Sequence, residues 1–441
     1  MNGASMSRPM AQSRVRAHQS TLDNGLRVVA VPQGALHRVH VGLYVSVGSR
    51  HETRENNGIT HFLEHMLYRG TERLPTAHRQ NLAFERLGGT LSAATLADHT
   101  YIGVTVPPAS LGGVLELLGE VLVAPKLGDI ELERRIVREE ILEDLDEDGR
   151  QIDPDNVTRA TAFGDHPLGF TITGPVDGLM RFDERLLRSH LARFYVARNS
   201  VLAIGGACDE GEVLALAKKH LHALPPGEPQ SPMPFVPVQK GVRRRHVASP
   251  GSQTDLRISF VTPGEHDRQA AAIELLLRCL DDGMSTRLYQ RLCDDGGLVY
   301  DTHASWEPYA DSGIFDVTAE AQHTVLPEVV ATILATLHEL AVEGPTEDEI
   351  DKARARHRWA IEAAHDGAED LVALLGGAVF FERPVDLEAQ AARFDRLGPS
   401  DVAEAARAVF CRSRMQFVTV GTLHGKVREK VRAIVSEFGR S

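Results

Sequence analysis

The chain has 441 residues, of which 42% are hydrophobic and 25% are charged, a composition that is ordinary for a globular protein. This length exceeds that of a typical single domain, so we expect two or more domains. The net charge of −13 argues against nucleic acid as a partner, because binding to phosphate requires a basic surface.

The N-terminal stretch 1–25 contains no apolar core, so it is not a secretory signal. It contains Arg8, Arg14 and Arg16 but no acidic residue before Asp23. We interpret it as a short disordered tail, and a mitochondrial transit peptide is the alternative. The longest apolar run, 371–381, is shorter than the roughly 20 residues that cross a bilayer, so we expect no membrane span. The four cysteines form no C-x-x-C pair and do not suggest a disulfide framework, which favours a reducing compartment. The expected location is a bacterial cytoplasm, with the mitochondrial matrix as the alternative.

Apolar runs at 25–31 and 39–48 have the pattern of β-strands, and 88–106 also reads as strands after a Gly-Gly turn. Helical patterns of mixed length separate such runs in each half of the chain. This order predicts an α+β fold, in which helices pack on a sheet.

The stretch 60–70, THFLEHMLYRG, has the period of an amphipathic helix. Gly70 is suited to end this helix. We therefore predict a helix of about two to three turns that is buried on one side. Its apolar residues fall at i, i+3, i+4, i+7 and i+8 and form one stripe, made of Ile59, Phe62, Leu63, Met66 and Leu67.

The apolar stripe does not explain the histidines of this stretch. His61 and His65 are four residues apart, so their side chains lie one above the other, about 5–6 Å apart at Cβ, and can share one metal ion. Glu64 lies on the same side, where a carboxylate can take a proton from a metal-bound water.

The segment 129–155 contains twelve acidic residues and four arginines, which together contribute −8 to the net charge. One interpretation is a solvated helix face, and the other is a negative field that attracts basic peptides. Within it, 130–146 has a helical pattern whose apolar arc is bordered by Glu133 and Glu140, whereas Glu139 points away. A catalytic zinc site usually takes three protein ligands, so Glu140 is the candidate third ligand and Glu133 a candidate supporting residue.

A proline-rich segment at 225–238 contains six of the 22 prolines and predicts a stiff linker near the middle of the chain. An aromatic residue, a polar turn, a β-rich run and a glycine follow one another at 194–206, and the same order returns at 410–422. We call the alignment that places 194–206 on 410–422 the repeat register. We therefore predict two homologous domains, at 18–224 and 241–441, that are joined by a linker at 225–240.

These features resemble the M16 (pitrilysin/insulinase) family of zinc metallopeptidases. HFLEH at 61–65 resembles its inverted motif H-x-x-E-H, and ERRIVREEI at 133–141 resembles the helix that completes its zinc site. The resemblance extends from about residue 22 to the C-terminus, and it is nearest to the short M16B subunits, such as mitochondrial processing peptidase β-like chains and bacterial heterodimeric peptidases. Further similar stretches are FERLGGTLSAAT at 84–95, HPLGFTITGP at 166–175 and GMSTRLYQRL at 283–292.

The resemblance implies a LuxS/MPP-like metallohydrolase fold, with two homologous α+β domains that are each a mainly antiparallel sheet flanked by helices. It also implies a Zn²⁺ cofactor held by His61, His65 and Glu140, with Glu133 in supporting contact. In the implied mechanism, zinc lowers the pKa of water, and Glu64 takes a proton from that water and passes it to the leaving amine.

The segment 292–300, LCDDGGLVY, departs from the family pattern L-R-E-K-R-G-L-A-Y, whose arginine and tyrosine hold the substrate and stabilise the oxyanion. Tyr300 is kept, but Cys293 and Gly296 occupy the two basic positions, and Arg291 is out of register. In a purely structural interpretation, Tyr300 only packs. In the functional interpretation, a second M16-like chain supplies the missing arginine–tyrosine pair, and a homodimer is less favoured.

The expected function is that of a zinc-dependent metalloendopeptidase subunit, the catalytic chain of a heterodimer that cleaves extended peptides inside a dimeric chamber. The acidic segment 129–155 favours basic substrates, such as leader or presequence-like peptides. The alternative is a non-catalytic core-type or substrate-holding subunit of the same fold. The complete set of His61, Glu64, His65 and Glu140 favours the catalytic subunit.

Overall fold

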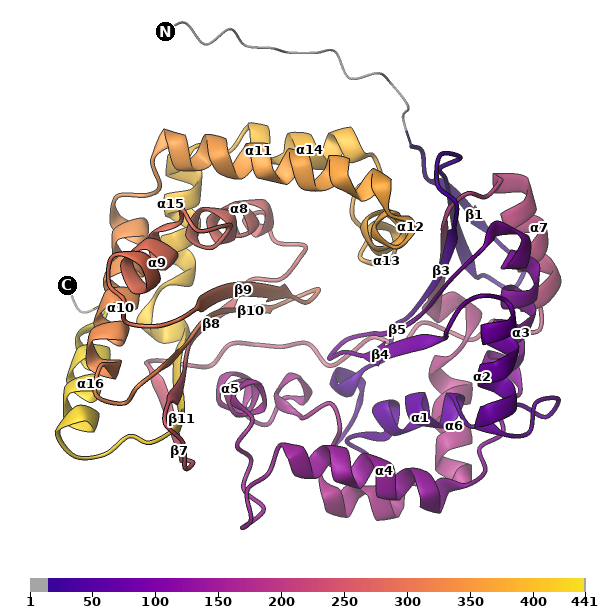
Figure 1. The fold of residues 1–441 in the computed structure, drawn as a ribbon, viewed down its shortest axis with the longest axis horizontal. Coiled ribbons are helices and arrows are strands. Elements are labelled where there is room, and N and C mark those ends of the chain that lie inside the picture. The colour runs from indigo at the N-terminus through magenta and orange to yellow at the C-terminus, as the bar shows by residue number, and fades with distance from the viewer. Residues whose placement is uncertain (1–14, 440–441) are drawn as a thin grey trace, which may run out of the picture.

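A computed structural model describes residues 15–439 (Figure 1). Most of the N-terminal stretch that we interpreted as a tail or a transit peptide therefore lies outside the described residues. Within the described part of the chain, no helix has both the length and the apolar character that crossing a bilayer requires.

The first sheet has six strands in the order β1-β2-β6-β3-β5-β4. Only β2 and β6 pair in parallel, and the other neighbours are antiparallel. β4 forms one edge of this sheet. The strands are β1 (His18–Thr21), β2 (Arg27–Pro32), β3 (Val39–Val45), β4 (Ser92–Thr95), β5 (Thr100–Val106) and β6 (Ser200–Gly206).

The second sheet has five strands in the order β7-β11-β8-β10-β9, again with a single parallel pair, β7 and β11. The expected α+β fold with two mainly antiparallel sheets is therefore confirmed. The strands are β7 (Arg243–Ala248), β8 (Thr254–Thr262), β9 (Thr302–Pro308), β10 (Gly313–Ala321) and β11 (Met415–Gly421).

The two sheets repeat one topology, because β7-β11-β8-β10-β9 corresponds strand for strand to β2-β6-β3-β5-β4. The repeat register found in the sequence carries β2 onto β7 without a gap, and it carries the start of β6 to the position next to the start of β11. The helices that cover one face of each sheet follow the same order. We call residues 18–224 the first half and 241–441 the second half.

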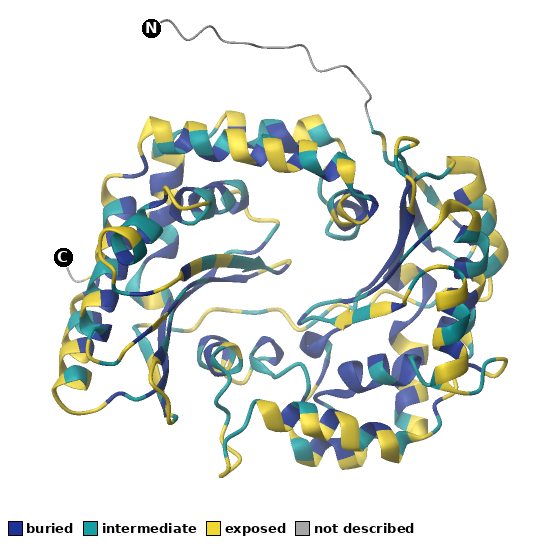
Figure 2. Ribbon diagram, in the orientation of Figure 1, coloured by how far each residue is buried: buried dark blue, intermediate teal, exposed yellow. Residues whose placement is uncertain are grey.

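Each half buries its own core between its sheet and its helices (Figure 2). The first half contains α1 (Ile59–Leu67), α2 (Ala77–Arg86), α3 (Leu111–Val123), α4 (Ile130–Glu143), α5 (Pro154–Phe163), α6 (Glu184–Phe194) and α7 (Glu210–Leu221). The second contains α8 (Ala270–Leu280), α9 (Arg287–Tyr289), α10 (Leu326–Val342), α11 (Glu347–Ala363), α12 (Ala368–Leu371), α13 (Gly377–Phe380), α14 (Leu387–Asp395), α15 (Pro399–Val409) and α16 (Gly425–Glu437).

The halves exchange one helical segment each (Figure 1). α5 of the first half packs on the second sheet, where Val157 is buried with Val247, Val418 and Val420. The segment 368–380, which contains α12 and α13, packs in return on the first sheet. The repeat register carries α5 onto 370–379, so the exchanged segments are equivalent. Leu371, Val372, Leu375 and Val379 are buried there with Val29, Val31, Tyr44, Val201 and Ala203.

The segment 225–240 contains neither helix nor strand and runs between the two halves (Figure 1). An ion pair with a buried arginine lies where this segment passes the hairpin between β9 and β10. The Arg50 side chain, 1% exposed, reaches Asp311 of that hairpin at 2.6 Å and donates to the Met233 carbonyl at 3.2 Å. The linker, a turn of the first half and a hairpin of the second half are thus joined at one point.

Candidate metal centre

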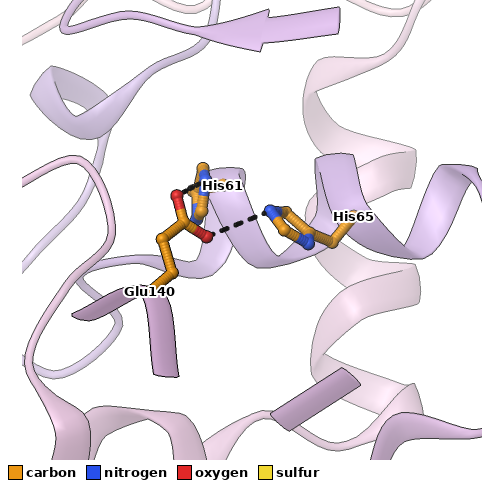
Figure 3. Close-up of side chains that lie close together, drawn as sticks. All are labelled: His61, His65 and Glu140. Carbon is orange, nitrogen blue, oxygen red and sulfur yellow. Dashed lines mark ion pairs between the residues drawn. The ribbon is translucent and has the colours of Figure 1, made fainter. Parts of the chain in front are cut away.

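The helix α1 has the predicted amphipathic character. All five residues of the predicted apolar stripe are at most 1% exposed. The helix ends at Leu67, and Gly70 follows with a φ of 114°, a conformation that favours glycine. Burial of this stripe fixes the rotation of the helix, so that His61 and His65 point together toward α4 (Figure 3).

Glu140 of α4 meets both histidines (Figure 3). Its carboxylate oxygens lie 3.3 Å from His61 Nε2 and 3.4 Å from His65 Nε2. One ligand atom from each of the three residues lies within 4.8 Å of the others. These are the three side chains that the sequence predicts as ligands of one metal ion, and the structure brings them together.

This donor set fits a zinc ion in type and in spacing. Two imidazole nitrogens and one carboxylate oxygen are ligands that Zn²⁺ prefers, with bonds of about 2.0–2.1 Å. Tetrahedral ligands with such bonds lie about 3.3–3.4 Å apart, and the measured nitrogen–oxygen distances of 3.3 and 3.4 Å agree with this spacing. The Glu140 side chain is 41% exposed, so the cluster is open to solvent on one side.

Glu133 lies one heptad before Glu140. It orients His65 by contacting the ring nitrogen that does not face Glu140. Its carboxylate lies 2.8 Å from His65 Nδ1 and also pairs with Arg69 Nε. Burial would raise the pKa of Glu133, but the hydrogen bonds from His65 and Arg69 lower it below the usual value. An ionised Glu133 holds the Nδ1 proton of His65, which leaves Nε2 free to bind a metal ion.

The two carboxylates that contact His65 strengthen its hold on a proton. Burial lowers the pKa of His65, but the carboxylates of Glu133 and Glu140 outweigh this and raise it to about 9. Hydrogen bonds from His61 and His65 lower the pKa of Glu140 far below its usual value. Metal ligands must be deprotonated histidine and ionised carboxylate, so binding of a metal ion releases a proton from this site.

Glu64 lies on the same side of α1 as the histidines, and it is 7% exposed. Thr95 Oγ1 donates a hydrogen bond to the Glu64 carboxylate at 2.6 Å. Thr95 is the last residue of β4, the edge strand of the first sheet. The candidate general base is therefore fixed to a strand whose outer edge is free within the described chain.

The helical prediction for 130–146 is wrong at its end, because α4 ends at Glu143. Asp144 caps the helix, and Leu145 forms a bridge with Gln151 instead of a further helical turn. The facing prediction holds, because Glu133 is 2% exposed whereas the Glu139 side chain is 71% exposed.

The second half does not repeat the cluster. α8 stands where α1 stands in the first half and contains no histidine. The repeat register carries Glu140 onto Arg356, whose guanidinium pairs with Asp282 at 2.6 Å. Among the described residues, a cluster that could hold a metal ion is found in the first half alone.

The segment 292–300 offers no arginine at the expected positions. Cys293 is partly buried against the second core, and a Cβ on Gly296 would lie 2.2 Å from the Arg291 carbonyl oxygen. Arg291 points to α10, where it pairs with Glu339 at 2.8 Å. Tyr300 is 94% exposed, so it is not a packing residue of the isolated chain.

Two contributors to this site were not identified from the sequence, Thr95 and Arg69. Thr95 and Glu64 are 31 residues apart, and Glu133 and Arg69 are 64 apart. No spacing rule within one element connects such pairs. Only the placement of β4 and α4 around α1 brings them together.

Two family models match the chain. The model "Insulinase (Peptidase family M16)" matches residues 27–176, which include all the candidate site residues of the first half. The model "Peptidase M16 inactive domain" matches residues 182–356.

Curated relatives and solved structures agree with these models. An uncharacterized zinc protease of Mycobacterium leprae is 29% identical over 368 residues, which cover 81% of each chain. The zinc protease PqqE of Helicobacter pylori is 27% identical and covers 92% of this chain and 93% of its own. The crystal structure of a protease from Helicobacter pylori aligns with a TM-score of 0.84 at 23% identity, over 93% of this chain and all of that chain. A Pseudomonas fluorescens structure described as a peptidase M16 inactive domain aligns with a TM-score of 0.84 at 20% identity, over 93% of this chain and 99% of its own.

Proposed function

The chain belongs to the M16 family of peptidases, and on this premise we propose that it is a zinc-dependent metalloendopeptidase subunit that cleaves extended peptides. The observation that carries the proposal is the convergence of His61, His65 and Glu140 beside Glu64. The zinc proteases among its relatives support the same metal.

In the proposed mechanism, His61 Nε2, His65 Nε2 and a carboxylate oxygen of Glu140 would hold the ion. Zinc, when bound, supplies Lewis-acid chemistry that lowers the pKa of water toward neutrality and polarises a carbonyl oxygen. Glu64 takes a proton from the attacking water while the oxygen of that water bonds to the peptide carbonyl carbon. Glu64 then gives that proton to the amine nitrogen as the carbon–nitrogen bond breaks.

The edge strand β4 is the proposed binding place of the substrate. An extended peptide can add to a free sheet edge through main-chain hydrogen bonds. Because Thr95 of β4 also holds Glu64, a peptide on this edge lies beside the proposed general base. The acidic segment 129–155, whose helix α4 supplies Glu133 and Glu140, favours basic peptides such as leader or presequence-like peptides.

A second M16-like chain is the proposed partner, in a heterodimer whose chamber encloses the peptide. Tyr300 is exposed, and Arg291, the arginine next to the family's position in the sequence, is engaged by Glu339. The partner would supply the arginine and tyrosine that hold the substrate. A homodimer is the less favoured arrangement.

The alternative function is that of a non-catalytic, substrate-holding subunit, which the loss of the basic positions at Cys293 and Gly296 favours. Such a subunit has no use for an ionised Glu133 behind His65 or for a hydrogen bond that aims Glu64. Zinc binding and catalysis by the purified chain distinguish the two functions.

The test compares wild type with Glu64→Gln, and with Glu139→Gln as a matched control on the outer face of α4. We expect one zinc per chain in all three proteins by elemental analysis. Peptidase activity, measured with the partner chain, should fall about 10²- to 10⁴-fold in Glu64→Gln alone. Absence of stoichiometric zinc in wild type would refute the proposed peptidase function. Full activity of the chain as a homodimer would refute the proposed heterodimer.

A further inference from the structure

The turn before α1 contains a buried carboxylate that the proposed chemistry does not use. Glu52 follows the short 3₁₀ turn Ser49–His51 and is 3% exposed. Its side chain points at the N-terminus of α1 and makes three hydrogen bonds there. Gly58 N donates to Oε2 at 2.7 Å, Thr60 N donates to Oε1 at 2.9 Å, and Asn57 Nδ2 donates to Oε2 at 2.9 Å.

These bonds replace the cap that α1 lacks. Its N-cap is Gly58, which has no side chain, and no acidic residue stands in its first turn. The first N–H groups of a helix have no partner within the helix and carry positive partial charge. Glu52 accepts hydrogen bonds from the N–H groups of Gly58 and Thr60 and so supplies partners at the positive end of the helix.

The residues just before α1, Asn57 and Gly58, pack closely against the stretch HPLGFTITGP at 166–175. Asn57 Nδ2 also donates to the Thr171 carbonyl at 2.9 Å. A Cβ on Gly58, whose φ is 93°, would lie 2.5 Å from the Thr173 carbonyl oxygen, and a Cβ on Gly174 would lie 2.4 Å from the Asn57 carbonyl oxygen. These close approaches between backbone segments restrict movement of the start of α1.

α1 has nine residues, and helices this short are marginal unless tertiary contacts hold them. His61 is its third residue, so a change in the first turn moves the His61 imidazole directly. His61 Nδ1 is buried without a hydrogen-bond partner among the described residues, so no hydrogen bond orients this ring from behind. His65, by contrast, is fixed by Glu133.

We propose that Glu52 is a positioning residue for the metal site: by binding the Gly58 and Thr60 N–H groups, it sets the place of His61 relative to His65 and Glu140. This inference rests on the proposed zinc site. It assigns to Glu52 the orienting role for His61 that Glu133 has for His65.

The test is the variant Glu52→Gln, which keeps the size of the side chain. An amide has one acceptor oxygen, so its NH₂ group must face at least one of the three donors, and at least one bond is lost. We expect zinc affinity, measured by competition with a chelator, to fall roughly tenfold, as for other residues that support metal ligands. The visible absorption of the cobalt-substituted protein should change as well, because it reports the geometry of the ligands.

Two controls separate this role from general stability. Glu55→Gln makes the same charge change three residues away on an exposed side chain and should leave affinity and spectrum unchanged. Leu337→Ala weakens the second core, far from α1, and should lower the melting temperature without altering the cobalt spectrum.

The outcomes are distinct. If wild type binds no zinc, the proposed function fails. If wild type binds zinc and Glu52→Gln binds it as tightly with an unchanged cobalt spectrum, the positioning role fails. Should Glu52→Gln not fold, Glu52→Asp draws the carboxylate back from the Gly58 and Thr60 N–H groups while keeping its charge, and an affinity and a cobalt spectrum equal to those of wild type would overturn the inference.

Discussion

At the scale of single residues, the proposed base is aimed by one hydroxyl. Thr95 Oγ1 donates a hydrogen bond to the Glu64 carboxylate at 2.6 Å. The bond is partly buried, so water competes with it less than at the surface. A hydrogen bond to a charged group contributes about 1.5–3 kcal/mol, more than one between neutral groups. The bond also couples the base to the strand on which we place the substrate.

We therefore predict that Thr95→Val, which keeps the shape and removes the donor, lowers kcat/KM roughly 10- to 100-fold. The zinc content should stay at the wild-type level, because Thr95 contacts none of the three candidate ligands. The measurement is steady-state peptide hydrolysis together with elemental analysis. Thr161→Val is the control, since that hydroxyl bonds only to the Val157 carbonyl of its own helix. Equal losses in the two variants would contradict the prediction.

The sequence indicated His61, Glu64, His65 and Glu140, because each lies on a periodic element whose facing can be derived. It did not indicate Thr95 or Glu52. Glu52 caps a helix from eight residues before Thr60, and the N-cap position itself is Gly58, so no capping pattern is present to find.

At the scale of elements, α4 divides its acidic residues between two faces. Glu133 and Glu140 are a heptad apart and both reach α1, whereas Glu139 pairs only with its neighbour Arg138 at the surface. An exposed pair of this kind contributes about 0–1 kcal/mol. The inward face therefore builds the site, and the outward face contributes to the negative surface.

This division predicts different outcomes for one substitution at two positions. Glu133→Gln should lower zinc affinity about 10- to 100-fold, because His65 loses the carboxylate that fixes its Nδ1 proton. Glu139→Gln removes the same charge from the same helix and should leave the affinity unchanged. Competition of each purified variant with a chelator measures the difference. A similar drop in both would mean that the overall negative field, and not the contact with His65, controls binding.

The predicted helix extends beyond the observed end of α4, and this error has a local cause. Leu145 continues the apolar period of the helix and is partly buried against the first core, so the pattern extends beyond the helix itself. Apolar periodicity reports which side of the chain is buried. The end of a helix depends also on the backbone bonds that compete with it, here the bridge from Leu145 to Gln151.

At the scale of the whole molecule, the internal repeat predicts two similar sheets but not how they meet. Strands pair within each half, where local patterns determine their faces. The exchange of α5 for the segment 368–380 depends on surfaces far apart in sequence, such as Val157 with Val418. A sequence pattern does not show which of two equivalent sheets a helix covers.

The interface of α5 with the second sheet contains a buried charge that is poorly compensated. Asp316 of β10 faces α5, and its Oδ1 atom is buried without a hydrogen-bond partner among the described residues. Burial raises the pKa of Asp316 to about 6, against the lowering effects of Ser259, Arg257 and Arg159. Asp155 of α5 adds to the increase.

This pKa predicts how stability depends on pH. Asp316 has a higher pKa in the folded chain than in the unfolded chain, where an aspartate titrates near 3.9. The folded state therefore binds the proton more tightly, and the contribution of Asp316 is fully present below about pH 4 and is lost as the pH rises through about 6. A shift of two units corresponds to about 3 kcal/mol at most.

Asp316→Asn should remove this loss, because its side chain is neutral at every pH. We expect the variant to exceed wild type in free energy of unfolding by about 1–3 kcal/mol at pH 7.5, with the difference shrinking toward zero at pH 4. Urea unfolding at a series of pH values measures it. Asp295→Asn, an exposed carboxylate in the segment 292–300, should stay within about 0.5 kcal/mol of wild type throughout. A difference for Asp316→Asn that is constant from pH 4 to 7.5 would show that the side chain acts through packing and not through its charge.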